Sequence, residues 1–196
     1  MKQSKIYLFK DRDDYIKKLT NDDIYNITGE KGSGKTYFGK MKDNDPSCTV
    51  LHLDYIFSNN TESINDSKNV RNILAKKYNT LNPDKFFEDK YYDELIKYLN
   101  NKNNTGYIEG GSIAEIEDVS KIKGTIVVKR TGVFKCFKRA VKRDYNNKYF
   151  MNLEKEKHKY FYKIIRFFKV IKRRLKIFKT YHKIEDFIRR IENYKN

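Results

Sequence analysis

The sequence predicts a three-layer α/β domain, with a short parallel β-sheet flanked by helices, followed by a basic helical C-terminal extension. Three observations support this prediction. Short apolar runs alternate with helical segments along the first three quarters of the chain. A glycine-rich turn at residues 29–36 stands between a predicted strand and a predicted helix. The last quarter has a helical pattern, and residues 151–196 hold 15 Lys or Arg against 5 Asp or Glu.

The N-terminal third contains two apolar runs and two helical patterns. Residues 6–9 fit either a strand or part of a helix, and as a strand they would occupy a sheet edge. Residues 11–19 have apolar positions at helical spacing. Residues 23–28 predict a strand that leads into the glycine-rich turn. Residues 36–42 predict a helix that stops before a cluster of turn residues at 43–46.

The middle of the chain continues the alternation. Residues 48–54 form an apolar run typical of a strand buried in a parallel sheet. Two helices are predicted next, at 67–78 and at 83–100, the second with a proline in its first turn. Short strands are predicted at 106–109 and 124–129.

The C-terminal part is predicted to be helical. Residues 133–144 form a strongly basic helix, and the chain from residue 153 onward has a helical pattern with a break near Thr180. We therefore expect one α/β domain at 1–150 that includes the 133–144 helix, and a basic amphipathic extension at 151–196. Nothing in the sequence indicates a second globular domain.

The composition indicates a cytoplasmic protein that meets anionic partners. The formal net charge is +17, which favours a phosphorylated substrate, nucleic acid or acidic lipid. The charged N-terminus does not resemble a signal peptide, and no run reaches the roughly 20 apolar residues of a membrane span. Cys48 and Cys136 lack metal-ligand spacing, and we expect both to be reduced thiols.

The glycine-rich turn predicts a phosphate-binding loop. It reads Gly29, Glu30, Lys31, Gly32, Ser33, Gly34, Lys35 and Thr36, and so matches G-x-x-x-x-G-K-[ST] in full. The glycines let backbone N–H groups point at one phosphate, Lys35 bridges the β- and γ-phosphates, and the Thr36 hydroxyl ligates Mg²⁺. The alternative is an ordinary glycine turn beside a surface lysine. The flanking strand and helix favour the phosphate loop of a P-loop NTPase fold.

Two acidic positions follow predicted strands. Asp54 ends the second strand, where it would accept a hydroxyl proton or orient a substrate; the alternative is a helix N-cap or turn residue. Glu109 ends the third strand, where it would hold a Mg²⁺-bound water, and Gly110 and Gly111 would let the backbone approach a substrate. A loop carboxylate and a flexible turn are the alternative there.

The 133–144 helix is predicted to be a lid over the phosphates. Its cations recur on one helical face: Lys135, Lys138, Arg139, Lys142 and Arg143. Such a stripe would neutralise charge that develops during phosphoryl transfer, and Arg139 and Arg143 are the expected contacts because a guanidinium grips phosphate bidentately. A solvated surface helix is the alternative.

With these residues in order, the chain resembles the nucleoside and nucleotide kinase group of P-loop proteins. That group includes adenylate, shikimate and uridine kinases and the small proteins named for DNA topology modulation. The resemblance covers residues 24–144, and it departs from the group in lacking a predicted core strand after the lid. It implies ATP and Mg²⁺ as cofactors, and a lid that closes on ATP. The guanine-reading N-K-x-D motif of GTPases is missing.

The extension has the pattern of a basic amphipathic helix. Apolar residues recur at three- and four-residue steps: Phe161, Ile164, Ile165, Phe168, Ile171, Leu175 and Phe178. Cations occupy most positions between them. The functional interpretation is docking of residues 153–179 on an anionic membrane, with nucleic acid as a weaker alternative; otherwise the apolar face packs on the domain.

Together these features predict a kinase that transfers the γ-phosphate of ATP to a small acceptor. Lys35, Asp54, Arg139 and Arg143 would be its catalytic residues, and the acceptor a nucleoside, nucleotide or sugar-like alcohol. The basic tail favours a peripheral place at the membrane and a pathway such as surface-polysaccharide synthesis. The alternatives are an NTP-binding regulator associated with nucleic acid or an anionic membrane, and a scaffold that has lost catalysis.

Overall fold

The computed structural model describes residues 6–9, 24–57, 65–79, 89–147, 152 and 161–195. Within them lies one five-stranded sheet in the order β1-β5-β2-β4-β3, and every paired strand is parallel. The strands are β1 (Ile6–Phe9), β2 (Ile24–Gly29), β3 (Cys48–His52), β4 (Thr105–Glu109) and β5 (Thr125–Lys129). The predicted parallel α/β sheet is confirmed.

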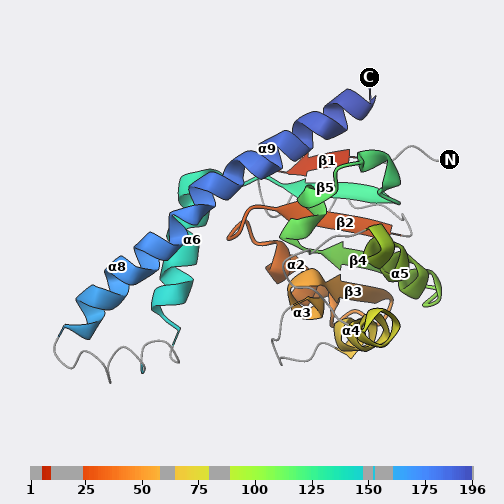
Figure 1. Cartoon of the computed structure of the whole chain (residues 1–196), viewed down its shortest axis with the longest axis horizontal. Helices are drawn as coiled ribbons and strands as arrows, with labels where there is room; N and C mark the ends of the chain where they lie inside the picture. The colour runs from red at the N-terminus through yellow and green to blue at the C-terminus, as the bar shows by residue number, and fades with distance from the viewer. Residues whose placement is uncertain are drawn as a thin grey trace.

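Helices cover the sheet and extend beyond it (Figure 1). The α-helices are α2 (Lys35–Lys42), α3 (Leu53–Ile56), α4 (Asn65–Tyr78), α5 (Asp89–Asn100), α6 (Val133–Tyr145), α8 (Tyr162–Arg174) and α9 (Lys176–Lys195). Two 3₁₀ turns, η1 (Gly111–Glu115) and η2 (Val119–Lys121), lie between β4 and β5. None of the helices in the described ranges is both long enough and apolar enough to cross a bilayer.

Side chains alternate in direction along each strand, so that both faces of the sheet are covered and three layers result. Tyr25, Ile27 and Val127 point to one face, where they join Phe38 of α2. Ile24 and its like-facing neighbours on the other strands point to the opposite face, where α4, α5, η1 and α9 cover them. Successive side chains of a strand point to opposite faces, so the sheet is buried on both sides, as a parallel sheet requires.

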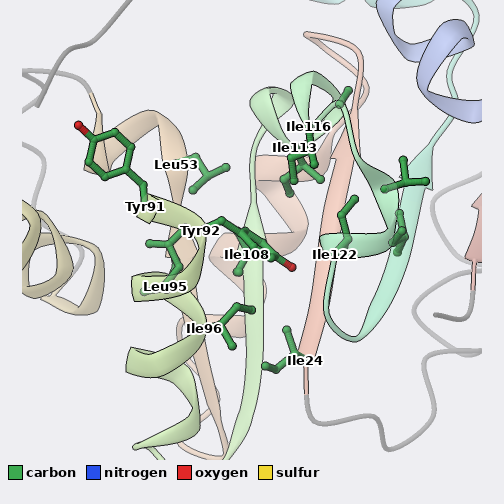
Figure 2. Close-up of a cluster of buried hydrophobic side chains, with 14 of the residues drawn as sticks. Ile24, Leu53, Tyr91, Tyr92, Leu95, Ile96, Ile108, Ile113, Ile116 and Ile122 are labelled. Carbon is green, nitrogen blue, oxygen red and sulfur yellow. The ribbon is translucent and has the colours of Figure 1, made fainter. Parts of the chain in front are cut away.

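The larger core cluster joins segments far apart in the sequence. Figure 2 shows Tyr92 and Ile96 of α5 lying against Ile108 of β4 and Ile24 of β2. The C-terminal helix α9 adds Phe187, which is fully buried, together with Ile184, Ile188 and Ile191. Burying one such side chain contributes about 1.5–3 kcal/mol. The apolar face of α9 therefore packs on the domain.

Several boundaries differ from the prediction. The second predicted strand ends at His52 rather than at residue 54, because the chain turns at Leu53 into the short helix α3. The break in the C-terminal helical region falls at Leu175, between α8 and α9, and not at Thr180, which lies inside α9. The helix predicted at 11–19 and the first part of the one at 83–100 lie outside the described residues.

The N-terminal segment occupies the sheet edge. Strand β1 pairs with β5 in parallel, with Ile6 opposite Ile126 and Phe9 opposite Lys129. No strand follows α6 in the described part of the chain. Of the two interpretations of residues 6–9, a strand or part of a helix, the structure shows the edge strand.

Candidate phosphate site

The glycine-rich turn forms a tight loop between β2 and α2. Gly34 has φ 97° and ψ 13°, a left-handed conformation directly before the first residue of α2. Gly32 has φ 92°, and a Cβ added there would lie 2.7 Å from the carbonyl oxygen of Cys136 in α6. Residues with a side chain rarely adopt these backbone φ values, so both positions require glycine. The loop thus curls at the N-terminus of α2 and touches α6, an arrangement suited to an anion.

The loop lysine and threonine occupy distinct positions. Lys35 is buried, and its Nζ donates to the carbonyl oxygen of Glu30 at 3.4 Å, so that the ammonium lies over the loop. Thr36 donates its hydroxyl to Oε1 of Glu109 at 3.2 Å. The loop and the end of β4, 73 positions apart in sequence, are therefore joined at one edge of the sheet.

Glu109 is held by a second residue that the sequence interpretation missed. His52, at the end of β3, is fully buried; its Nδ1 lies 2.9 Å from Oε2 of Glu109 and its Nε2 lies 3.0 Å from Oδ2 of Asp43. Burial lowers the pKa of His52, but the bonds and charges of the two carboxylates outweigh burial and raise it overall. The register pairs His52 with Glu109 across β3 and β4, which no short-range pattern reveals.

Glu30 places an acid inside the loop. The residue is 3% exposed, and its Oε1 has no hydrogen-bond partner among the described residues. Burial raises the pKa of Glu30 to about 7, against the opposing charge of Lys35 and a bond from the Lys31 backbone. Near neutral pH this carboxyl is thus partly protonated, which limits the negative charge inside the loop.

A second lysine that the sequence interpretation missed lies beside the loop. Lys129 ends β5 and is buried, and its Cε lies 3.8 Å from where a Cβ of Gly34 would stand. Its carbonyl oxygen would lie 2.4 Å from a Cβ on Gly29, so the end of β5 packs directly on the start of the loop. The sequence signal was a cation ending an otherwise apolar strand.

Helix α6 brings its predicted cations close to the loop. Arg139 Nη1 lies 3.5 Å from the carbonyl oxygen of Gly32, and the five-cation stripe predicted on this helix is exposed along its length. Lys31 is exposed at the surface, yet partial desolvation of its ammonium by the surrounding chain lowers its pKa, and the nearby charges of Arg174 and Arg143 lower it further. Cations from the loop, α6 and the end of α8 therefore converge, as a polyanion site requires.

The end of α6 is clamped by α8. Arg166 is 2% exposed and donates to the carbonyl oxygens of Tyr145 at 2.8 Å, Asp144 at 2.7 Å and Asn147 at 2.8 Å. The carboxylate of Asp144 in turn accepts from Arg173 and Arg174. The bonds from Arg166 reach carbonyl oxygens at the end of α6, where the last carbonyl groups of a helix lack N–H partners from a further helical turn. Together these bonds hold the cations of α8 next to α6.

The predicted acceptor residues lie at the same edge. Asp54 stands exposed in the first turn of α3, and its negative charge reaches Lys31 and opposes the lowering of the Lys31 pKa. Gly110 packs on Leu53, whose Cβ would lie 2.7 Å from an added Cβ, so packing explains the glycine there. Gly111 faces open space. Contact of Asp54, Gly110 or Gly111 with a substrate stays a prediction.

The donor set fits magnesium bound together with a nucleotide. The described residues contain no group of three His, Cys, Asp or Glu that would hold a metal alone. Mg²⁺ beside phosphates needs only one or two protein oxygens, since the phosphates and waters complete its shell. Thr36 and Glu109 are such a pair.

Cys48 and Cys136 are free thiols, and burial raises the pKa of Cys136 to about 11, so that it stays protonated.

Comparison with known proteins leaves the site to be judged by its own chemistry: no family model matches the chain, and neither the curated proteins nor the solved structures give a match.

Proposed function

We propose that this protein is an ATP- and Mg²⁺-dependent kinase that phosphorylates a small acceptor bearing a hydroxyl or phosphate. The observation that carries the proposal is the 3.2 Å bond between Thr36 of the loop and Glu109 of the neighbouring strand. In phosphoryl-transfer enzymes of the P-loop type, a loop hydroxyl and a carboxylate from a nearby strand hold Mg²⁺ together. An ordinary glycine turn has no need of either residue.

Each part of the loop has a role in holding the triphosphate. The backbone N–H groups of the turn and the N-terminus of α2 cradle the phosphates. Lys35, whose Nζ donates to the Glu30 carbonyl at 3.4 Å, would supply the cation for the β- and γ-phosphates. Thr36 and Glu109 would hold Mg²⁺, which neutralises phosphate charge when bound. Glu109 keeps its orientation through His52.

Transfer needs an acceptor base and cations around the moving phosphoryl group. Asp54, two residues beyond the end of β3, orients the acceptor hydroxyl and takes its proton. Arg139 and Arg143 come from α6 and stabilise the charge on the equatorial oxygens. Arg174 adds a cation from α8 that sequence reasoning did not single out, and its carboxylate partner Asp144 orients it.

Titration calorimetry with ATP and Mg²⁺ tests the proposal first. The wild-type protein is expected to bind, and Lys35→Ala to lose at least about tenfold in affinity, while Lys40→Ala, an exposed position on the same helix, leaves binding unchanged. A screen of hydroxyl-bearing acceptors for ADP release then identifies the substrate. The kinase assignment fails if no heat accompanies nucleotide addition, or if both variants bind as the wild type does.

A nucleotide-binding regulator of nucleic acid is the second candidate. It is favoured by the cation density, since residues 161–178 hold seven Lys or Arg and no acid. The two functions separate in one comparison. Steep salt dependence of oligonucleotide binding with a sequence or structure preference supports the regulator, whereas ATP turnover that requires a small acceptor supports the kinase.

A further inference from the structure

Helix α8 exposes apolar side chains and buries a charged one. Phe161, which precedes it, is 67% exposed, Ile164 is 57% exposed and Phe168 is 64% exposed. On the opposite face Arg166 is 2% and Val170 7% exposed. A helix that only packs on its own domain has the reverse arrangement, with the apolar side chains inward.

The inward arginine fixes this orientation. Arg166 donates three hydrogen bonds to the carbonyl oxygens at the end of α6, and its guanidinium lies 5.8 Å from the ring centroid of Tyr145. Rotating α8 to bury Phe168 would break those three bonds and carry the guanidinium away from the end of α6, a costly exchange. The apolar stripe therefore faces outward because the clamp on α6 requires it.

The outward stripe is continuous and has cations beside it. Its members recur at three- and four-residue steps and so share one face: Phe161, Ile164, Phe168, Ile171 and Leu175. Leu175 is 51% exposed and Ile171 is half-buried. Lys169, Lys172 and Lys176 are exposed along one flank. Single exposed apolar residues need no explanation, but a contiguous stripe marks an interaction site.

The stripe also stands apart from the sheet. Figure 1 shows α8 and α9 following each other as one long rod, with α8 beside α6 and extending past the sheet. Helix α9 contributes to the main core cluster, whereas no residue of α8 belongs to it. The end of the rod that carries the stripe is thus accessible to a large flat partner.

We propose that α8 docks on an anionic lipid membrane, lying in the plane of the interface with its Phe and Ile side chains among the acyl chains. At 13 residues the helix is about 20 Å long and lies along the surface rather than spanning it. Lys172 and Lys176 reach the headgroups while their aliphatic stems cover the edge of the stripe. Membrane docking would bring α6 and the phosphate loop near the surface.

Charge and side-chain type favour the membrane over two other partners. No acidic residue occurs between positions 157 and 184, so a symmetric pairing of two copies through α8 would oppose like charges. Nucleic acid would be read by base stacking on aromatic rings, and Ile164 and Leu175 cannot stack. Both aliphatic residues suit a hydrocarbon layer.

Vesicle co-sedimentation tests the docking. The full chain is expected to bind vesicles of phosphatidylglycerol with phosphatidylcholine, to bind pure phosphatidylcholine much more weakly, and to release at high salt. The double variant Phe161→Ser with Phe168→Ser should lower the partitioning of the protein onto anionic vesicles at least about tenfold. Lys172→Gln with Lys176→Gln should lower it roughly tenfold on anionic vesicles alone.

Matched controls separate the stripe from general surface effects. Ile73→Ser with Tyr194→Ser removes two exposed apolar residues elsewhere, and Lys68→Gln with Lys76→Gln removes two exposed cations of α4; both should bind as the wild type does. Lys35→Ala should also bind vesicles normally, so the docking and the kinase assignment fail independently.

Three results would overturn the docking. The first is no binding to anionic vesicles at low salt. The second is equal loss in the stripe and control variants. The third is a partner other than lipid: a dimer, measured by sedimentation, that the Phe161/Phe168 variant dissociates, or oligonucleotide binding that outcompetes vesicles and depends on the same stripe.

Discussion

His52 and Glu109 form a buried pair in which Nδ1 of the imidazole lies 2.9 Å from Oε2 of the carboxylate. The other oxygen of Glu109 accepts from Thr36, so both carboxylate oxygens have partners. The imidazole also fills the space beneath α2, where a Cβ on Gly39 would lie 2.5 Å from Cε1 of His52. The carboxylate proposed to serve Mg²⁺ is thus oriented before any ligand arrives.

His52→Gln should lose stability in a pH-dependent way. The folded pKa of His52 is raised above its ordinary value of 6.5, so its stabilising contribution is complete below that value and declines as pH rises through the folded pKa. Urea denaturation at about pH 5.5 and about pH 9 should show the larger wild-type advantage, about 1–3 kcal/mol, at the lower pH.

The exposed His182 of α9 provides the control for this experiment. His182→Gln should leave unfolding unchanged within about 0.5 kcal/mol at either pH. If the wild type exceeds His52→Gln in unfolding free energy by the same amount at both pH values, the charged pair of His52 and Glu109 is contradicted.

Glu30→Gln should stabilise the protein at alkaline pH. Burial raises the pKa of Glu30 from 4.5 to about 7, so the folded wild type loses stability between those two pH values as the carboxyl ionises. The variant avoids this loss and should gain ~1–3 kcal/mol at about pH 8 and little at about pH 4, as measured by urea denaturation. Glu117→Gln, an exposed substitution, should show no such gain, and an equal gain at both pH values would argue against a buried acid.

Asp54→Asn should separate binding from transfer. The amide keeps the size of the side chain but cannot take a proton, so nucleotide affinity should change less than about twofold while transfer to an acceptor falls about a hundredfold or more. Single-turnover transfer and calorimetry provide the two measurements. Asp93→Asn, on the exposed surface of α5, is the control. Transfer at the wild-type rate would remove Asp54 from the acceptor site.

Arg166→Met should destabilise the protein by ~2–4 kcal/mol. The substitution keeps an unbranched side chain but removes the guanidinium that donates to the carbonyl oxygens of Tyr145, Asp144 and Asn147. Lys163→Met, exposed on the same helix, should change stability by less than about 0.5 kcal/mol. Guanidinium denaturation measures both, and equal midpoints would show that the clamp contributes nothing.

Local patterns predicted the scaffold because strands and turns are encoded over short windows. Residues 106–109 read as a strand and lie in β4, and the turn from Gly29 read as a phosphate loop and curls between β2 and α2. The boundaries of the elements were predicted less well. Residue 54 falls in α3, since no local signal marks the change from strand to helix after His52.

Short-range patterns were enough to predict the alternating parallel architecture, the glycine turn with Lys35 and Thr36, and the cation stripe of α6. Hydrophobic period and glycine conformation act within a few residues, and so they can be read in order along the chain. Three other relationships could be seen only in the folded chain: His52 pairs with Glu109, Lys129 lies beside the loop, and Arg166 turns inward while Phe168 faces out. Those relationships depend on strand register and helix packing, which join residues tens of positions apart and leave no periodic trace in the sequence.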